Sequence, residues 1–359
     1  MIPKETHRYR IPKVGKIFVL ISIYTIFLIG AFFVTETIFR IKIIGYQKTI
    51  SSYFNPTHQP SVLGVNDWVV SDPDLNYKLN PSKPHINVFS MPEKEIMIPK
   101  PSGLTRIIVL GDSISYSGDP SFVDLLKSKY ARHSNIEILN ASTPGYTTYQ
   151  EMIFLKKYLL TLEPDLVILS YCLNDNFTFL HRFDENVNMI WTEEAEESLA
   201  IENTIDAITN KSYFLTAIKI AFTQKQRLQE KHEYPWEGII DFNIAWKDYS
   251  WIDFSRWFKE MDDDMRGING KLFMVIFPLK MQFAQELSQY DHELVIKPQK
   301  NALHYCNKYN IKCLDLFDDF LENINRDKEL YTDGIHLSDD GHIISSEIIF
   351  NFINSEYFN

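Results

Sequence analysis

Three residues of this chain have the side chains of a nucleophile, a base and a carboxylate that orients the base: Ser113, His336 and Asp333. A serine hydroxyl is a weak nucleophile near neutral pH, so Ser113 needs a base to take its proton, and His336 is the candidate. Asp333, three residues before His336, can accept a hydrogen bond from the imidazole Nδ1 atom and leave Nε2 facing the serine. This trio predicts nucleophilic attack on an acyl carbonyl, with Ser113, Asp333 and His336 as the catalytic residues.

The same chemistry needs hydrogen-bond donors for the carbonyl oxygen, which becomes negatively charged during the attack. The predicted donors of this oxyanion hole are the backbone N–H groups of Ser113 and Gly145 and the side-chain amide of Asn174. Loss of one such donor typically costs about 2.7–4 kcal/mol of transition-state stabilisation.

The segments around these residues alternate between short apolar strands and amphipathic helices. The predicted strands are RIIVLGDS, 136–142, 165–171, 271–277 and 311–316. Four helices are predicted: one that begins behind Asp119 as its cap, one over 149–162, one over 283–309, and a last one after Ser338. Apolar strands that alternate with helices indicate a parallel sheet covered on both faces, a three-layer α/β sandwich. Reactive groups gather at the carboxyl ends of such strands, which is where the site residues stand.

With these residues in place, the chain resembles the SGNH hydrolases, the GDSL esterase and lipase superfamily. The four matching blocks are GDS with Ser113 followed by Ile, NASTPGYTT with Gly145, LND with Asn174, and DGIH with Asp333 and His336. The resemblance covers about 106–358. It implies a flavodoxin-like α/β/α fold and hydrolysis or transfer of ester-linked acyl groups without a metal or cofactor. The third block is usually G-x-N-D, and Cys172 stands here in place of the glycine, so the backbone near Asn174 is expected to differ.

Five other residues near the site have simpler explanations than catalysis. Ser115 and Cys172 are expected to pack in the fold, and His342 is expected to cap or pack in the last helix although it is the one rival base near the loop. Asp112 and Asp175 are expected to brace their loops through local hydrogen bonds.

A long segment, 176–270, interrupts the alternation with a mostly helical pattern, and an insertion of this length in a compact domain is usually a cap or lid. It contains five of the six tryptophans: Trp191, Trp236, Trp246, Trp251 and Trp257. Two interpretations stay open for these side chains, a platform for sugars or acyl chains and the core of the inserted helices.

The start of the chain predicts a membrane anchor. Residues 17–35 are uncharged, and at about 1.5 Å per residue they span roughly 28 Å, close to the thickness of a bilayer core. The run is longer than the apolar core of a signal peptide, the alternative interpretation, and no small-residue cleavage site follows Phe33. Five basic residues precede it, which favours a cytoplasmic N-terminus.

These observations predict four parts: a cytoplasmic N-terminus (1–16), a transmembrane helix (17–39), an irregular lead-in segment (40–103), and a hydrolase-like domain (104–359) that contains the insertion.

The chain has 359 residues, 45% of them hydrophobic, which excludes disorder. The formal charge is −11 overall and −15 after residue 16, which argues against nucleic-acid binding. Three cysteines exclude a disulfide scaffold, and a bond between Cys306 and Cys313 stays open. Metal-ligand spacings are absent from the sequence.

Three functions compete. The first is an anchored serine esterase, hydrolase or transferase, that acts outside the cytoplasm on short acyl esters such as O-acetyl groups of envelope or secreted glycans. The second is a lipase or lysophospholipase that acts on the adjacent membrane. The third is a non-catalytic envelope-assembly protein that keeps the fold, and a distance between Ser113 and His336 beyond hydrogen-bond reach would favour it.

Overall fold

The computed structural model describes residues 13–54, 68–179, 182–183, 189–190, 212, 214–215, 218, 234, 236 and 240–358. The chain divides into two compact units. We call Met1–Val65 with Leu199–Gln226 the N-terminal unit, and Asn66–Ser198 with Arg227–Asn359 the sheet unit.

The core of the sheet unit is a five-stranded parallel sheet. Its strands are β3 (Thr105–Gly111), β4 (Ile136–Asn140), β5 (Leu166–Tyr171), β8 (Lys271–Ile276) and β9 (Lys312–Asp315). They lie in the order β4-β3-β5-β8-β9, and every neighbouring pair is parallel, with Ile107 opposite Leu166 in the central pair. In chain order this is 2-1-3-4-5, the flavodoxin-like arrangement, so the predicted fold class is confirmed.

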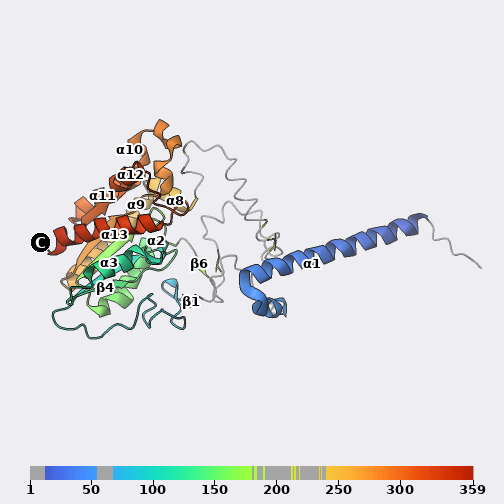
Figure 1. Cartoon of the computed structure of the whole chain (residues 1–359), viewed down its shortest axis with the longest axis horizontal. Coiled ribbons are helices and arrows are strands. Elements are labelled where there is room, and N and C mark those ends of the chain that lie inside the picture. The colour runs from blue at the N-terminus through green and yellow to red at the C-terminus, as the bar shows by residue number, and fades with distance from the viewer. Residues whose placement is uncertain are drawn as a thin grey trace, which may run out of the picture. The chain divides into compact units, whose positions relative to one another are not determined.

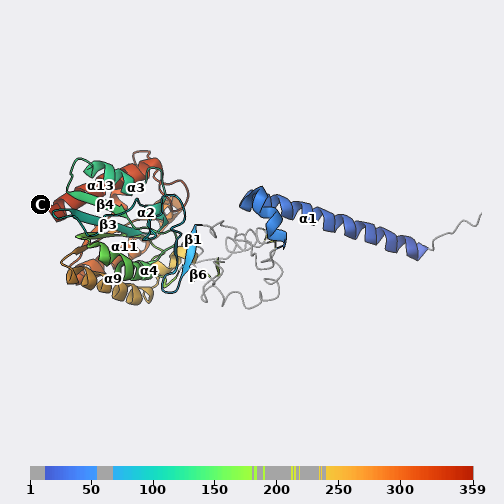
Figure 2. The same ribbon diagram turned by 90° about the horizontal axis from the view of Figure 1, so that it is seen from below.

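Helices cover both faces of this sheet, as Figure 2 shows. On one face lie α3 (Phe122–Tyr130) and α13 (Asp339–Ile353), which pack on each other. On the other lie α4 (Thr148–Phe154), α9 (Ser250–Gly267) and α11 (Lys297–Tyr309). Every residue of β5 is buried between the two layers, which explains the apolar run 166–169 with which the strand begins.

The remaining elements of the sheet unit are short. They are the hairpin β1 (Val69–Asp72) and β2 (Asn76–Leu79), the pair β6 (Arg182–Phe183) and β7 (Met189–Ile190), and the helices α2 (Ser113–Tyr116), α8 (Ile240–Asn243), α10 (His292–Val295) and α12 (Phe317–Ile324). Single turns of 3-10 or π helix cover Leu155–Leu159, Leu160–Leu162, Ile244–Trp246, Lys280–Phe283, Gln285–Gln289 and Asn354–Phe358.

Two helix boundaries differ from the sequence prediction. The helix expected behind Asp119 begins at Phe122, because Ser121 and Asp124 form a reciprocal capping box at that point. The helix expected over 283–309 is broken into short turns, and its regular part, α11, begins only at Lys297 with Pro298 in its first turn. Proline lacks the N–H that a continuous helix needs and fits the first turn instead.

The tryptophans of the insertion belong to the core. Trp236, Trp246, Trp251 and Trp257 are each at most 5% exposed, so the interpretation as core is confirmed for these four. Trp191 lies outside the described residues. Helix α9 also proves to be the crossover helix that leads from β5 to β8, so the sheet itself accounts for the end of the predicted insertion.

A disulfide joins Cys306 at the end of α11 to Cys313 in β9, with Cα atoms 6.1 Å apart. The bond, which the sequence left open, closes the connection between the helix and the edge strand.

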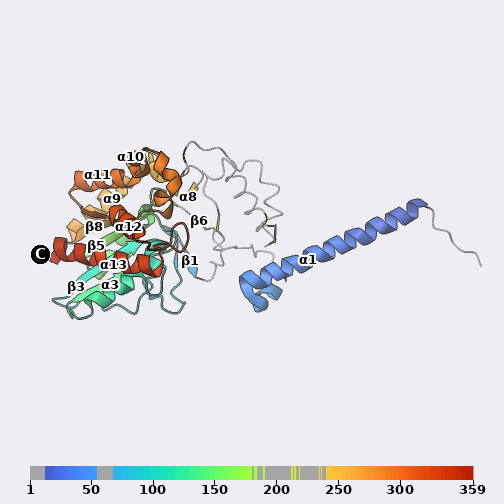
Figure 3. The same ribbon diagram turned by 45° about the horizontal axis from the view of Figure 1, so that its top comes forward.

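The N-terminal unit is built on α1 (Lys13–Phe54), shown in blue in Figures 1 and 3. Its segment Phe18–Lys42 is long and apolar enough to cross a membrane. Near its C-terminal end the helix bends back sharply (Figure 1), and Tyr53 therefore reaches Thr37 with a hydroxyl distance of 2.7 Å.

Candidate active site

Ser113 is placed by the turn that joins β3 to α2. The side chain of Asp112 caps α2 and accepts a hydrogen bond from the N–H of Ile114 at 2.9 Å. At Gly111, a Cβ atom would lie 2.7 Å from the Ser115 hydroxyl oxygen and 2.9 Å from the Ser170 Cβ, so only glycine lets the strand approach this closely. The tripeptide Gly-Asp-Ser thus sets a half-buried hydroxyl at the carboxyl edge of the sheet.

His336 bridges the serine and the carboxylate. Its Nε2 atom lies 3.1 Å from the Ser113 hydroxyl oxygen, and its Nδ1 atom lies 2.7 Å from an oxygen of Asp333. The loop that carries both residues is closed by a bridge between Tyr331 and Leu337. The three predicted catalytic side chains therefore form one continuous hydrogen-bonded chain. The non-catalytic hypothesis would be favoured by a Ser113–His336 distance beyond hydrogen-bond reach, and the distance here is within it.

The carboxylate of Asp333 is held in place by the backbone of its own loop. Its second oxygen accepts hydrogen bonds of 2.7 Å from the N–H groups of Ile335 and His336. Partial burial raises the pKa of Asp333, but the hydrogen bonds from the His336 ring and from these two N–H groups outweigh burial, and the pKa is lowered overall. Asp333 therefore stays ionised and can stabilise an imidazolium on His336.

The predicted oxyanion donors come from the ends of three adjacent strands: Ser113 after β3, Gly145 after β4 and Asn174 after β5. Gly145 has a φ of +77°, a conformation that a residue with a Cβ rarely adopts. Asn174 is 3% exposed, and its amide donates a hydrogen bond of 3.3 Å to Asp112. Asp112 thus both caps the nucleophile's helix and orients the amide, which agrees with its expected bracing role.

The β1–β2 hairpin braces the Gly145 loop, a function that the sequence prediction of an irregular lead-in missed. The hydroxyl of Tyr77 donates to the carbonyl of Pro144 at 2.9 Å, and the hydroxyl of Tyr146 donates back to the carbonyl of Tyr77 at 2.7 Å. Gln150 adds a bond of 2.8 Å to the carbonyl of Leu75. The turn-rich stretch DPDLN between two short strand-like runs is the signal that marks this hairpin in the sequence.

Tyr77→Phe is expected to lower kcat several-fold with little change in KM, because the loop that presents the Gly145 N–H loses its anchor. It is also expected to cost about 1 kcal/mol of unfolding free energy, the typical net value of one hydrogen bond. Tyr158→Phe is the matched control, since Tyr158 donates to Asp72 of the same hairpin at 2.7 Å but not to the loop. Steady-state kinetics and thermal unfolding of both variants test this, and equal kcat values for the two variants would contradict the bracing role.

Three buried carboxyl groups lie behind the predicted oxyanion hole: Asp112, Glu151 and Asp175. Burial raises the pKa of Asp112 to about 6. Burial also raises the pKa of Glu151 and of Asp175, and the negative charges of the other members of the group add to the effect. Asp175 accepts from the N–H of Cys172 at 2.9 Å, while both oxygens of Glu151 have no hydrogen-bond partner among the described residues.

These groups make stability fall as pH rises. Between the pKa of a carboxyl group in the unfolded chain, about 4, and its raised pKa in the folded protein, the folded protein keeps a proton that the unfolded chain has lost. The free energy of unfolding therefore decreases as the pH rises from about 4 through the pKa of Asp112 at about 6. Glu151→Gln removes one contributor and is expected to raise the melting temperature at pH 8 by about 3 °C or more, with a smaller gain at pH 4.5. The exposed Glu322→Gln is the control. Calorimetry at both pH values decides, and a gain that is larger at pH 4.5 would contradict this assignment.

The rival residues lie where packing explains them. Ser115 and His342 are buried. The Nδ1 atom of His342 accepts a hydrogen bond of 3.1 Å from the N–H of Phe122, so the ring is bound to the first residue of α3. Burial raises the pKa of Cys172 well above its usual value, so the thiol stays protonated and is a poor nucleophile. Within the described ranges, no three metal-ligating side chains come together.

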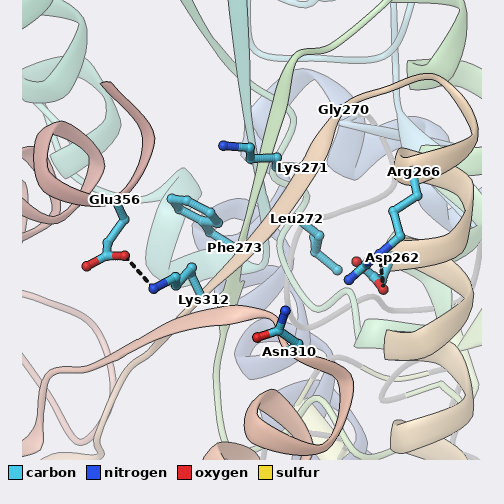
Figure 4. Close-up of a pocket in the computed structure, with 9 residues that line it drawn as sticks. All are labelled: Asp262, Arg266, Gly270, Lys271, Leu272, Phe273, Asn310, Lys312 and Glu356. Carbon is cyan, nitrogen blue, oxygen red and sulfur yellow. Dashed lines mark hydrogen bonds and ion pairs between the residues drawn. The ribbon is translucent and has the colours of Figure 1, made fainter. Parts of the chain in front are cut away.

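A pocket of about 330 Å³ lies at the other edge of the sheet, near the amino ends of β8 and β9 (Figure 4). Two ion pairs line it, Arg266 with Asp262 and Lys312 with Glu356. The predicted nucleophile and base, Ser113 and His336, stand at the carboxyl ends of the strands, away from this pocket.

Residues 109–344 match the model of the GDSL-like lipase/acylhydrolase family. Among solved structures, the acetyl xylan esterase AlAXEase is 14% identical, with a TM-score of 0.42, and the match covers 69% of this chain and 99% of that one. A lipase/acylhydrolase from Enterococcus faecalis is 16% identical, with a TM-score of 0.41 and coverage of 70% and 96%. No curated protein matches the sequence significantly. The matched region spans most of the sheet unit and contains Ser113, Gly145, Asn174, Asp333 and His336, and the chain belongs to the GDSL-like lipase/acylhydrolase family.

Proposed function

We propose that this acylhydrolase is a serine esterase that removes or transfers short acyl groups, such as acetyl, on envelope or secreted glycans outside the cytoplasm. The observation that carries the proposal is the unbroken hydrogen-bonded chain from Asp333 through His336 to Ser113. It stands at the carboxyl edge of a parallel sheet, where the predicted oxyanion donors Gly145 and Asn174 also stand.

In the proposed reaction, the Ser113 oxygen attacks the ester carbonyl carbon while His336 Nε2 takes the serine proton. The tetrahedral oxyanion accepts hydrogen bonds from the N–H groups of Ser113 and Gly145 and from the Asn174 amide. The C–O bond to the leaving alcohol then breaks, and the imidazolium gives its proton to that alcohol. Water or a sugar hydroxyl attacks the acyl-serine by the same steps in reverse, which frees the acid or a new ester.

Three observations support a location outside the cytoplasm, with the N-terminus inside. Five basic residues precede the apolar run 17–35, and only Arg40, Lys42 and Lys48 closely follow it. The disulfide between Cys306 and Cys313 is typical of oxidising compartments. Glu36 in α1 also accepts hydrogen bonds from Ser212 and Phe214, contacts that a cleaved signal peptide would not keep. They favour a permanent anchor.

The test is a panel of p-nitrophenyl esters with acetyl, butyryl and octanoyl groups, together with an acetylated glycan and a lysophospholipid. We expect the detergent-solubilised full chain to prefer the acetyl ester to the octanoyl ester by about tenfold or more, since each extra methylene that a pocket must hold changes specificity by about 10-fold or more. Preference for octanoyl ester and lysophospholipid would instead support the lipase function. Adding a glycan acceptor distinguishes transfer from hydrolysis by the appearance of acylated glycan.

A further inference from the structure

A buried ion pair stands at the C-terminal end of the apolar part of α1. Arg40 Nε lies 2.7 Å from an oxygen of Glu36, and the two residues are 6% and 2% exposed. By contrast, large apolar side chains earlier in the same helix are about half exposed or more, among them Phe18, Ile23, Phe27 and Phe33. Ionisable groups in such a segment are costly, and where they occur they mark a specific contact.

The cover for this pair comes from the insertion, more than 170 residues further along the chain. The hydroxyl of Ser212 donates to Glu36 Oε2 at 2.6 Å, and the N–H of Phe214 donates to the same oxygen at 3.0 Å. Ser212 in turn accepts from the N–H of Leu215 at 3.1 Å, as an N-terminal cap does. The Phe214 ring packs against Phe39, with ring centres 5.5 Å apart. Polar and apolar contacts therefore fix this part of the insertion to α1.

The bend in α1 completes the enclosure from the other side. The Arg40 guanidinium lies 4.3 Å from the centre of the Tyr53 ring. In a straight helix, residues thirteen apart would be separated by about 20 Å along the axis. The returning end of α1 and the segment around Ser212 together keep the Glu36–Arg40 pair away from the apolar surroundings of the helix.

Among the described residues of this unit, several apolar side chains are exposed. Its exposed side chains include Ile38, Ile41, Tyr46, Ile50 and Ile218, which are between 38% and 69% exposed. Three of them, Tyr46, Ile50 and Ile218, lie outside the segment Phe18–Lys42 that is long enough to cross a bilayer core. A mixture of Ile and Tyr directly outside a membrane-spanning helix is typical of the lipid headgroup region.

We propose that the N-terminal unit is a membrane-surface docking unit, in which the insertion around 212–218 lies in the outer headgroup region and is fastened to α1 through Glu36. This inference rests on the proposed anchoring of α1. The insertion follows β5 along the chain, joins the N-terminal unit at Leu199 and returns to the sheet unit at Arg227.

The test measures depth in the membrane with the full chain in phosphatidylcholine vesicles. Single cysteines at 27, 218 and 252 (Phe27→Cys, Ile218→Cys and Ile252→Cys) carry an environment-sensitive fluorophore, and the vesicles contain lipids spin-labelled in the headgroup or deep in the acyl chain. Ile252 is an exposed isoleucine of α9 and serves as the matched control. We expect the probe at 218 to be quenched about twofold more by headgroup labels than by deep labels, the probe at 27 to show the reverse, and the probe at 252 to be quenched by neither.

Glu36→Ala and Ser212→Ala then test the fastening. Each is expected to reduce the headgroup quenching at 218 by about half or more, because Glu36 and Ser212 make the hydrogen bond that holds the segment, while hydrolysis of p-nitrophenyl acetate is unchanged. An unquenched probe at 218 beside a deeply quenched probe at 27 would overturn this inference and leave the proposed function intact. An unquenched probe at 27 would instead overturn the anchoring itself.

Discussion

Ser113→Ala is expected to lower kcat/KM for p-nitrophenyl acetate by roughly a millionfold, the loss typical of a removed nucleophile in such a triad. The Ser113 hydroxyl is the group in hydrogen-bond reach of His336 Nε2, at 3.1 Å. Alanine removes the oxygen that must form the acyl-enzyme, and a water molecule in its place lacks the positioning that the β3–α2 turn supplies. Steady-state kinetics with the purified full chain measure the effect.

Ser115→Ala is the matched control for this variant. Ser115 is two residues further along, is buried, and has a hydroxyl with no hydrogen-bond partner in the part of the chain that the structure describes. It is expected to keep activity within about threefold of the parent, because removing an unpaired buried hydroxyl costs little. Full activity in Ser113→Ala, or the larger loss in Ser115→Ala, would contradict the assignment of the nucleophile.

The second large expected effect is the loss of kcat in variants of the predicted base, His336, and of its carboxylate partner, Asp333. His336→Ala is expected to lose roughly a millionfold in kcat and Asp333→Asn about ten-thousandfold, because asparagine leaves the base present but favours the wrong tautomer. The structure gives the reason in the 2.7 Å bond between His336 Nδ1 and Asp333. The kcat values of both variants at saturating ester, above pH 7, provide the measurement.

His342→Gln separates catalysis from packing in the same experiment. Its Nδ1 atom accepts a hydrogen bond from the N–H of Phe122, so the variant is expected to have a lower melting temperature and an unchanged kcat. If His336→Ala and Asp333→Asn both keep activity while His342→Gln loses it, the rival base is the true one.

The fold follows from the sequence where burial is uniform. The runs 107–110 and 166–169 are buried on both faces, so each is unbroken and apolar until Gly111 or Ser170 follows. Alternation with helices then limits the topology. The site follows for a related reason. The predicted nucleophile, donors and base each stand behind a strand or in the last loop, and parallel strands place these positions at the same edge of the sheet.

Other features depend on long-range contacts that leave little trace in local sequence. The bond from Tyr77 to Pro144 joins residues 67 apart, and that from Ser212 to Glu36 joins residues 176 apart. In neither pair do the residues adjacent in sequence form a pattern that predicts the contact. Glu151 is similar, since an acid within a helix is usually a surface residue, and only the packed structure shows that it is fully buried.

The central claim is that Ser113 is an activated nucleophile. It is tested most directly by treating the full chain with a fluorophosphonate, which reacts covalently with activated serines, and by locating the adduct with peptide mass spectrometry. We expect one adduct, on Ser113, which is lost in His336→Ala because the base no longer takes the serine proton. An adduct on another serine, or a Ser113 adduct that forms equally fast without His336, would contradict the account.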